Sequence, residues 1–198
     1  MTTLLTIGHS NHPIERFVAL LETYGVTAVA DMRSVPYSRA QPQFNRELLQ
    51  SVLVRSRIGY VFLGEDLGIA APDWRCRVDG RVDFTRVARS EAFLRGVQKV
   101  EAEMRRYRLT MMCSEGEPLQ CHRSILLSRH LAATGVQVQH ILPDGGMESQ
   151  EQIVERMLQQ LGLAEVDMFR TREQAIEDAY RICGERLPSN RPEVRESP

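Results

Sequence analysis

The stretch LTMMCSEGEPLQCHRSILLSRHL, residues 109–131, joins an apolar run to an amphipathic segment through a polar turn. The run LTMMC (109–113) has strand character, and the segment after Cys121 has the apolar spacing of a helix. A strand, a turn and a helix in succession form half of a β-α-β unit, in which strands lie parallel in one sheet. This stretch therefore predicts an α/β fold.

The same alternation of strand and helix patterns runs through the whole chain. Short apolar runs predict strands at 4–8, 26–32, 60–64, 109–113 and 136–142, and apolar periodicity predicts helices at 12–25, 45–59, 90–107, 121–135, 147–163 and 171–187. Asn45 and Ser90 are expected to cap helices, and Thr171 with Gln174 has capping-box spacing. We expect a three-layer fold with a mainly parallel five-stranded sheet flanked by helices and a helical C-terminal extension.

The chain divides by pattern into three parts. Residues 1–146 are expected to form the α/β core, residues 147–187 a helical extension packed on it, and residues 188–198 a disordered tail. Ile153, Met157, Leu158 and Leu161 make one apolar stripe, which favours packing of the extension on the core. The alternative for this stripe is the face of a homodimer.

Composition excludes some classes of protein. The net charge is −1, and no apolar run approaches the roughly 18 residues that span a bilayer. Four cysteines without a secretory signal predict reduced thiols and a cytoplasmic protein that does not bind membranes. Residues 33–108 hold fourteen Arg and one Lys against nine acidic residues, a balance of +6. An anionic partner is therefore better placed there than at the acidic C-terminal end, although a solvated charged face gives the same pattern.

Polar and reactive side chains gather where the predicted strands end. Ligands bind outside the carboxyl ends of parallel strands, and these ends share one edge of a sheet. We expect the following residues to lie close together there: His9, Ser10, Asp31, Arg33, Tyr37, Cys113, Glu115, Cys121, His122, Arg123 and Ser124.

The turn around Cys121 carries the chemistry of a reactive site. Cys121 or Cys113 near a helix start is expected to act as a thiolate nucleophile, and His122 and His9 to transfer protons. Each has a plainer interpretation: a small buried cysteine or a surface histidine. A metal held by Cys113, Cys121, His122 and His9 is disfavoured because seven residues separate the cysteines and no CxxC occurs, so no metal is predicted. A disulfide between Cys113 and Cys121 is a further alternative.

The other candidates are expected to bind the substrate. Arg33 and Arg123 are predicted to hold an anion through their forked guanidinium groups, with Asp31 orienting Arg33. Glu115 is expected to position His9 or a substrate hydroxyl, and Ser10, Ser124 and Tyr37 complete the predicted binding residues. The plain alternative for Arg33 beside Asp31 is a structural ion pair.

Several short motifs together resemble a known family. They are Thr6-Ile7-Gly8-His9-Ser10, Asp31 through Ser38, Phe44-Asn45, Tyr60 through Gly64, Cys113-Ser114-Glu115 and Cys121-His122-Arg123. The chain resembles, over roughly residues 3 to 146, the bacterial and archaeal family called domain of unknown function 488. The resemblance implies a cytoplasmic α/β protein and supplies no reaction.

The residues themselves favour an enzyme that acts on an anionic small molecule or nucleotide through a Cys/His/Arg site at the strand ends. One alternative is a module that binds nucleic acid or a nucleotide without turnover, which the Arg-rich middle of the chain suggests. Another is a thiol redox or metal sensor built on the two cysteines. No cofactor follows from the sequence.

Overall fold

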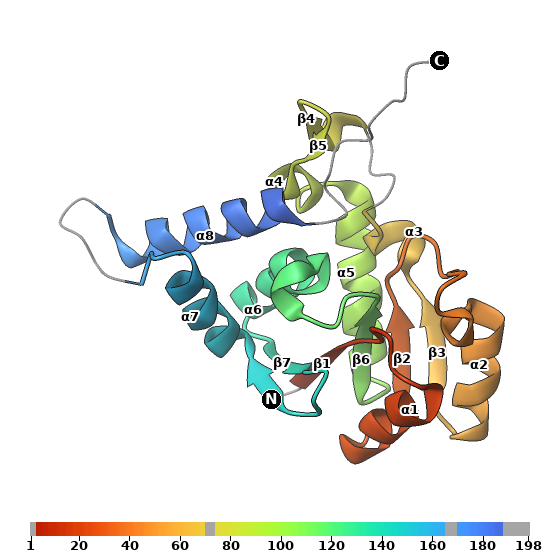
Figure 1. Ribbon diagram of the computed structural model, residues 1–198. Coiled ribbons are helices and arrows are strands. Elements are labelled where there is room, and N and C mark those ends of the chain that lie inside the picture. Colours follow the sequence, from red (N-terminus) through yellow and green to blue (C-terminus); the bar gives the residue numbers. More distant parts are fainter. Residues whose placement is uncertain (1–2, 70–73, 165–169, 188–198) are drawn as a thin grey trace.

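The computed structural model describes residues 3–69, 74–164 and 170–187, and a six-stranded sheet lies at its centre (Figure 1). Five strands run parallel, in the order β3 (Gly59–Phe62), β2 (Ala28–Asp31), β6 (Leu109–Cys113), β1 (Thr3–Gly8) and β7 (Gln137–Ile141). The sixth strand, β8 (Met147–Ser149), pairs antiparallel with β7. The predicted α/β class is confirmed, with one more strand than the five expected.

The added strand moves the start of the helix predicted at 147–163. Helix α7 (Gln150–Gln160) begins only after Ser149, whose side chain forms a capping box with Gln152. The capping box fixes the first turn of the helix after Ser149. The sheet therefore continues to residue 149, past the boundary that we placed at 146.

Helices cover both faces of the sheet. Strand side chains alternate between the faces: Leu5, Val29 and Met112 pack against α1 (Ile14–Thr23) and α2 (Arg46–Arg55). Leu4, Ala30 and Met111 point the other way. They pack with α3 (Gly64–Leu67), α5 (Glu91–Met104), the π-helix η4 (Arg123–Ser128) and α6 (Arg129–Ala133). The result is a three-layer arrangement.

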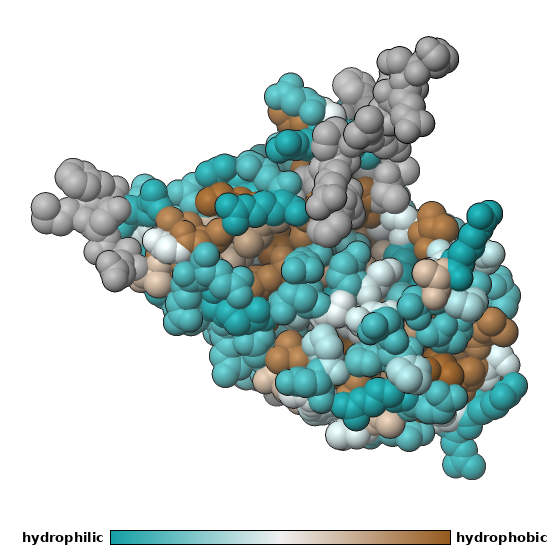
Figure 2. All heavy atoms as spheres, viewed as in Figure 1, coloured by the Kyte–Doolittle hydropathy of each residue, from teal (hydrophilic) through white to brown (hydrophobic). Residues whose placement is uncertain are grey.

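The C-terminal helices build a third apolar cluster. Ile153 and Met157 of α7 pack with Ala179 of α8 (Arg172–Arg186) and with Leu119 and Ile125 from the connection between β6 and β7. In Figure 1 these helices, in blue, lie on the side of the molecule away from β3 and α2. Figure 2, from the same viewpoint, shows apolar residues between α8 and the helices in front of the sheet, among largely hydrophilic residues on this face.

The irregular stretch predicted at 65–83 contains regular structure where it is described. After α3 come a 3-10 turn, η2 (Trp74–Cys76), and a hairpin of β4 (Arg77–Val78) and β5 (Arg81–Val82). Asp79 and Gly80 between them both have positive φ, at 49° and 76°, as an Asp-Gly hairpin turn requires. Asp83 then caps α4 (Phe84–Val87).

Two of the three predicted helix caps are present in the structure. Ser90 caps α5 and Thr171 forms the predicted capping box with Gln174. Asn45 precedes α2 without capping it, because its side-chain oxygen instead accepts a hydrogen bond from the Ser38 backbone at 2.7 Å. The predicted tail at 188–198 lies outside the described residues. Within the described part of the chain, no helix combines the length and apolar character that crossing a membrane demands.

Candidate functional site

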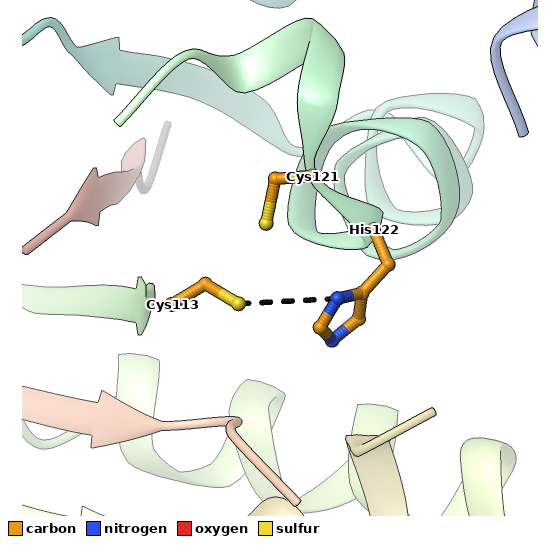
Figure 3. A group of neighbouring side chains, drawn as sticks. All are labelled: Cys113, Cys121 and His122. Carbon is orange, nitrogen blue, oxygen red and sulfur yellow. Dashed lines mark hydrogen bonds between the residues drawn. The ribbon is translucent and has the colours of Figure 1, made fainter. Parts of the chain in front are cut away.

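Two cysteines and a histidine meet at the carboxyl end of β6. Cys113 is the last residue of this strand, and Cys121 and His122 follow a 3-10 turn, η3 (Pro118–Gln120). The two sulfur atoms and one imidazole nitrogen lie within 4.8 Å of one another, and Cys113 Sγ is 3.8 Å from His122 Nδ1. Figure 3 shows the three side chains directed into the same space between the strand end and the start of the helix. All three are buried.

The helix that follows is not the regular α-helix expected at 121–135. Its first six residues, Arg123–Ser128, form a π-helix, and α6 continues from Arg129. Ser128 Oγ donates a 2.7 Å hydrogen bond to the Arg123 carbonyl five residues earlier. A π-helical turn is costly and often occurs at functional sites, which agrees with its position directly after His122.

Arg123 is buried and holds the turn together. Its guanidinium donates to the backbone carbonyls of Glu115 and Gly116, the latter at 2.7 Å. Among the described residues it forms no ion pair with a carboxylate. Two of the three guanidinium nitrogens therefore donate to the protein itself, whereas the predicted anion clamp needs these two nitrogens free. The positive charge of Arg123 nevertheless lies beside the cysteines.

Glycine at position 8 lets β1 approach this turn. Gly8 pairs with Cys113 across the two strands. A Cβ atom at Gly8 would lie 1.8 Å from the carbonyl oxygen of Glu115, which is the oxygen that Arg123 binds. The close approach of β1 to the turn is therefore possible only for a residue without a side chain.

The acidic groups in the cluster influence one another. Burial opposes ionisation of the Cys121 thiol, but the Cys113 thiol, the Arg123 charge and His122 together hold its pKa well below the ordinary value. The interaction with Cys121, with burial, raises the pKa of Cys113. Burial and the nearby Cys121 also raise the pKa of Glu115, which accepts a hydrogen bond from Cys113 Sγ at 3.1 Å. The positive charge of Arg123 therefore lies near three acidic groups, Cys113, Cys121 and Glu115. Ionisation of Cys121 opposes ionisation of the other two.

A second cluster forms around Asp31 and Arg33 after β2. Arg33 donates to both carboxylate oxygens of Asp31, at 2.9 and 2.6 Å, and also to the Phe44 carbonyl of η1 (Pro42–Phe44) at 2.9 Å. The Tyr60 hydroxyl donates to Asp31 at 2.8 Å. Burial, with the adjacent Asp31 charge, raises the pKa of Tyr60. The buried pair is neutral overall and held by hydrogen bonds, as the structural ion-pair interpretation anticipates.

His9 belongs to the second cluster. Its ring stacks on Phe44 with centroids 4.2 Å apart, and its Nδ1 lies 2.9 Å from the Ser10 carbonyl. Nδ1 therefore carries the hydrogen, and Nε2 accepts from Arg33 at 3.3 Å. Burial, reinforced by the Arg33 charge, lowers the pKa of His9 to about 4, so the imidazole is neutral at pH 7.

The two clusters share an edge of the sheet but not a face. Phe44, on which His9 stacks, belongs to the apolar cluster under α1 and α2. Cys113 and Cys121 belong to the apolar cluster under α5 and α6. The strand-end residues that we expected to lie close together therefore form two separate clusters. The reason is the alternation of side chains along β2 and β6, which directs Asp31 and Cys113 to opposite faces.

Three predicted site residues remain. Ser124 is fully buried, and its hydroxyl has no hydrogen-bond partner in the described structure. Ser10 has a φ of 50° and its amide donates to the Ser114 carbonyl at 2.9 Å, so it shapes the turn next to Cys113. Tyr37 is 61% exposed, unlike the buried residues of the two clusters.

Sequence reasoning missed a buried polar chain that ties the extension to the sheet. His140 Nδ1 lies 2.8 Å from Thr6 Oγ1, and His140 Nε2 lies 2.7 Å from Gln150 Oε1. Gln150 in turn donates to the Tyr180 hydroxyl at 2.8 Å. Burial lowers the pKa of His140 to about 4. The only sign of this chain in the sequence was a histidine, His140, within an apolar strand run, because Thr6 and Tyr180 lie far from it in the sequence.

Two described cavities lie away from both clusters. One of about 890 Å³ lies between the β4–β5 hairpin and α8, and one of about 680 Å³ lies beside α3 and the start of α5. None of the eleven predicted site residues lines either cavity.

Comparison with known proteins gives one result. The family model for DUF488, described as a domain of unknown function, matches residues 13–130. The match contains both cysteines of the cluster and the Asp31–Arg33 pair, and it begins after His9. No curated protein and no solved structure matches the chain significantly. Because the match covers more than half of its length, the chain belongs to the DUF488 family.

Proposed function

We propose that the protein is an enzyme that acts on an anionic small molecule at the carboxyl edge of the sheet, with Cys113, Cys121 and His122 as its reactive centre. The observation that carries this proposal is the convergence of these three side chains, from a strand end and the start of the next helix, beside the buried cation of Arg123. A structural core would fill this position with apolar side chains at lower cost, because burying charge without a paired carboxylate is unfavourable.

Unsatisfied polar atoms support a ligand at this place. His122 Nε2, Arg123 Nε and Ser124 Oγ are buried and have no hydrogen-bond partner in the described structure. Each of these groups can donate a hydrogen bond, and buried donors without partners are costly. An anionic molecule offers the acceptors and the negative charge that this turn lacks. His122 Nε2 then donates a hydrogen bond to the anion, and Arg33 and His9 serve the neighbouring structural cluster.

Turnover of small anionic esters tests the proposal. Wild type, Cys121→Ser, His122→Asn and Cys183→Ser are assayed on a panel of phosphate monoesters, phosphodiesters and carboxylate esters, with release of p-nitrophenol as the signal. We expect wild type and Cys183→Ser, which alters a half-buried thiol in α8, to turn over at least one class. Loss of the hydrogen bond from His122 Nε2 in His122→Asn should lower kcat by about 100-fold.

The result that would refute the proposal is equal turnover by wild type and Cys121→Ser, since the reaction would then lie elsewhere. Thermal-shift measurements with inorganic phosphate and AMP accompany the assay. Unchanged melting temperatures across these anions, together with no turnover of any ester, would remove the anionic substrate.

A nucleic-acid or nucleotide binding role without turnover remains the second candidate. The cavity of about 680 Å³ is lined by four arginines, Arg75, Arg86, Arg89 and Arg95, against three acidic residues. A phosphate chain held there should dissociate steeply with added salt. Failure to bind heparin at low salt would eliminate this role.

A further inference from the structure

The three donor atoms of the reactive centre lie nearly as close together as the ligands of one metal ion. Four ligands around zinc, at about 2.3 Å for sulfur and 2.0 Å for nitrogen, lie about 3.5 to 3.8 Å from one another. Cys113 Sγ and His122 Nδ1 are 3.8 Å apart, and both lie within 4.8 Å of Cys121 Sγ. Small side-chain adjustments therefore suffice to place all three donor atoms around one ion (Figure 3).

We propose that Cys113, Cys121 and His122 bind one zinc-class divalent transition-metal ion, with a fourth coordination position open to a ligand. The cysteine spacing disfavoured a metal, and this proposal reverses that expectation. It rests on the proposed function and deepens it by assigning a cofactor to the same centre. Two sulfur ligands and one nitrogen are a set that zinc accepts in catalytic sites, where three protein ligands leave room for water or substrate.

Burial favours ligands over a free nucleophile. Cys113 is 3% and Cys121 1% exposed, so neither sulfur faces solvent where a substrate could reach it directly. A metal-bound sulfur needs no such access, because it binds the ion inside the protein. The two cysteines therefore act as ligands in this proposal.

The charged side chains around the three donor atoms fit this assignment. Glu115 accepts a hydrogen bond from Cys113, and the buried Arg123 donates to the backbone of the same turn. The Arg123 charge is placed to attract an anion to the open position of the ion.

Glu115 is the residue placed to support this ion. Its Oε2 lies 3.1 Å from Cys113 Sγ, within reach of a water in the fourth position or of the ion itself. Side chains around metal ligands commonly alter metal affinity by 10- to 100-fold. We expect Glu115→Gln to weaken metal binding by about 10-fold while the chain stays folded.

Cobalt substitution and elemental analysis test the site without any substrate. Wild type, Cys121→Ser, His122→Asn and Cys183→Ser are reduced, stripped with chelator and titrated with Co²⁺ and then Zn²⁺, with circular dichroism reporting the fold. We expect one ion per chain and an intense thiolate-to-cobalt charge-transfer band in wild type and Cys183→Ser. Loss of one of two sulfur ligands in Cys121→Ser should reduce this band to about half or less.

The outcomes separate this proposal from the proposed function. A folded, reduced wild-type chain that takes up no metal, or one whose cobalt spectrum lacks a sulfur charge-transfer band, overturns the metal site. Equal metal content in Cys121→Ser, His122→Asn and wild type overturns it as well. Ester turnover by the metal-free protein would leave the enzyme standing and remove the ion from it. Metal binding without ester turnover would keep the site and refute only the proposed reaction.

Discussion

At the scale of single residues, the candidate site depends on what each position can hold in a crowded turn. Arg123 is long enough to reach the carbonyls of Glu115 and Gly116 from the helix start, and its charge sets the electrostatics of the cysteines. Gly8 has no side chain, so its strand, β1, can pass close to the Glu115 carbonyl. Chemistry and packing are thus decided by the same few atoms.

Gly8→Ala is expected to destabilise the protein by roughly 3 kcal/mol, because its Cβ would overlap the Glu115 carbonyl. The matched control is Gly59→Ala in β3, where a Cβ would meet Ala28 at 3.4 Å and the cost should stay within about 0.5 kcal/mol. Chemical denaturation measures both. Equal stability of the two variants would show that the turn shifts freely and does not fix the cysteines.

At the scale of elements, the π-helix and the capped helices decide where side chains point. The π-turn η4 changes the direction of residues after His122 from that of an α-helix. The capping box at Ser149 ends β8 and starts α7 at one residue, which places Gln150 under His140. Local hydrogen bonds of this kind determine register more strongly than apolar spacing does.

Removing the α7 cap tests this role. Ser149→Ala should lower the free energy of unfolding by about 1 kcal/mol, because the Gln152 amide loses its acceptor at 3.2 Å. Ser51→Ala, inside the exposed part of α2, serves as the control and should leave stability unchanged or slightly higher. Denaturant titrations compare the two variants, and an unaffected Ser149→Ala would mean that packing alone fixes the start of α7.

At the scale of the whole molecule, the polar chain from Thr6 through His140 and Gln150 to Tyr180 joins the sheet to the C-terminal helices. Together with the apolar cluster around Met157, it makes the extension part of the fold around the π-helix. The residues after 146 thus support the helix that carries the candidate site.

The buried His140 in this polar chain should make the free energy of unfolding depend on pH. The unfolded chain takes up a proton on His140 near pH 6.5, whereas burial keeps the folded imidazole neutral down to about pH 4. The unfolded state therefore binds more protons in this interval, and the free energy of unfolding falls as the pH drops from 6.5 to 4. For a shift of this size the loss is about 3 kcal/mol.

Denaturation of wild type and His140→Gln at several pH values measures this contribution. His9, whose pKa is also lowered to about 4, is present in both chains, so the difference between the two pH profiles isolates His140. The variant should show a flatter profile. Parallel profiles would mean that His140 does not remain neutral in the folded state.

The sequence by itself determined the α/β class and the order of the main strands and helices, and it predicted the turn at Cys121 as a candidate site. These follow from local periodicity and from capping residues such as Ser90 and Thr171, whose partners lie within a few positions. Only the tertiary structure decided that β1 lies between β6 and β7, and that His9 and Cys113 belong to different faces. It alone showed that Arg123 turns inward to backbone carbonyls and that His140 meets Gln150. The physical reason is that strand order, side-chain direction at strand ends and burial of charge arise from contacts between segments far apart in the chain, which no local pattern encodes.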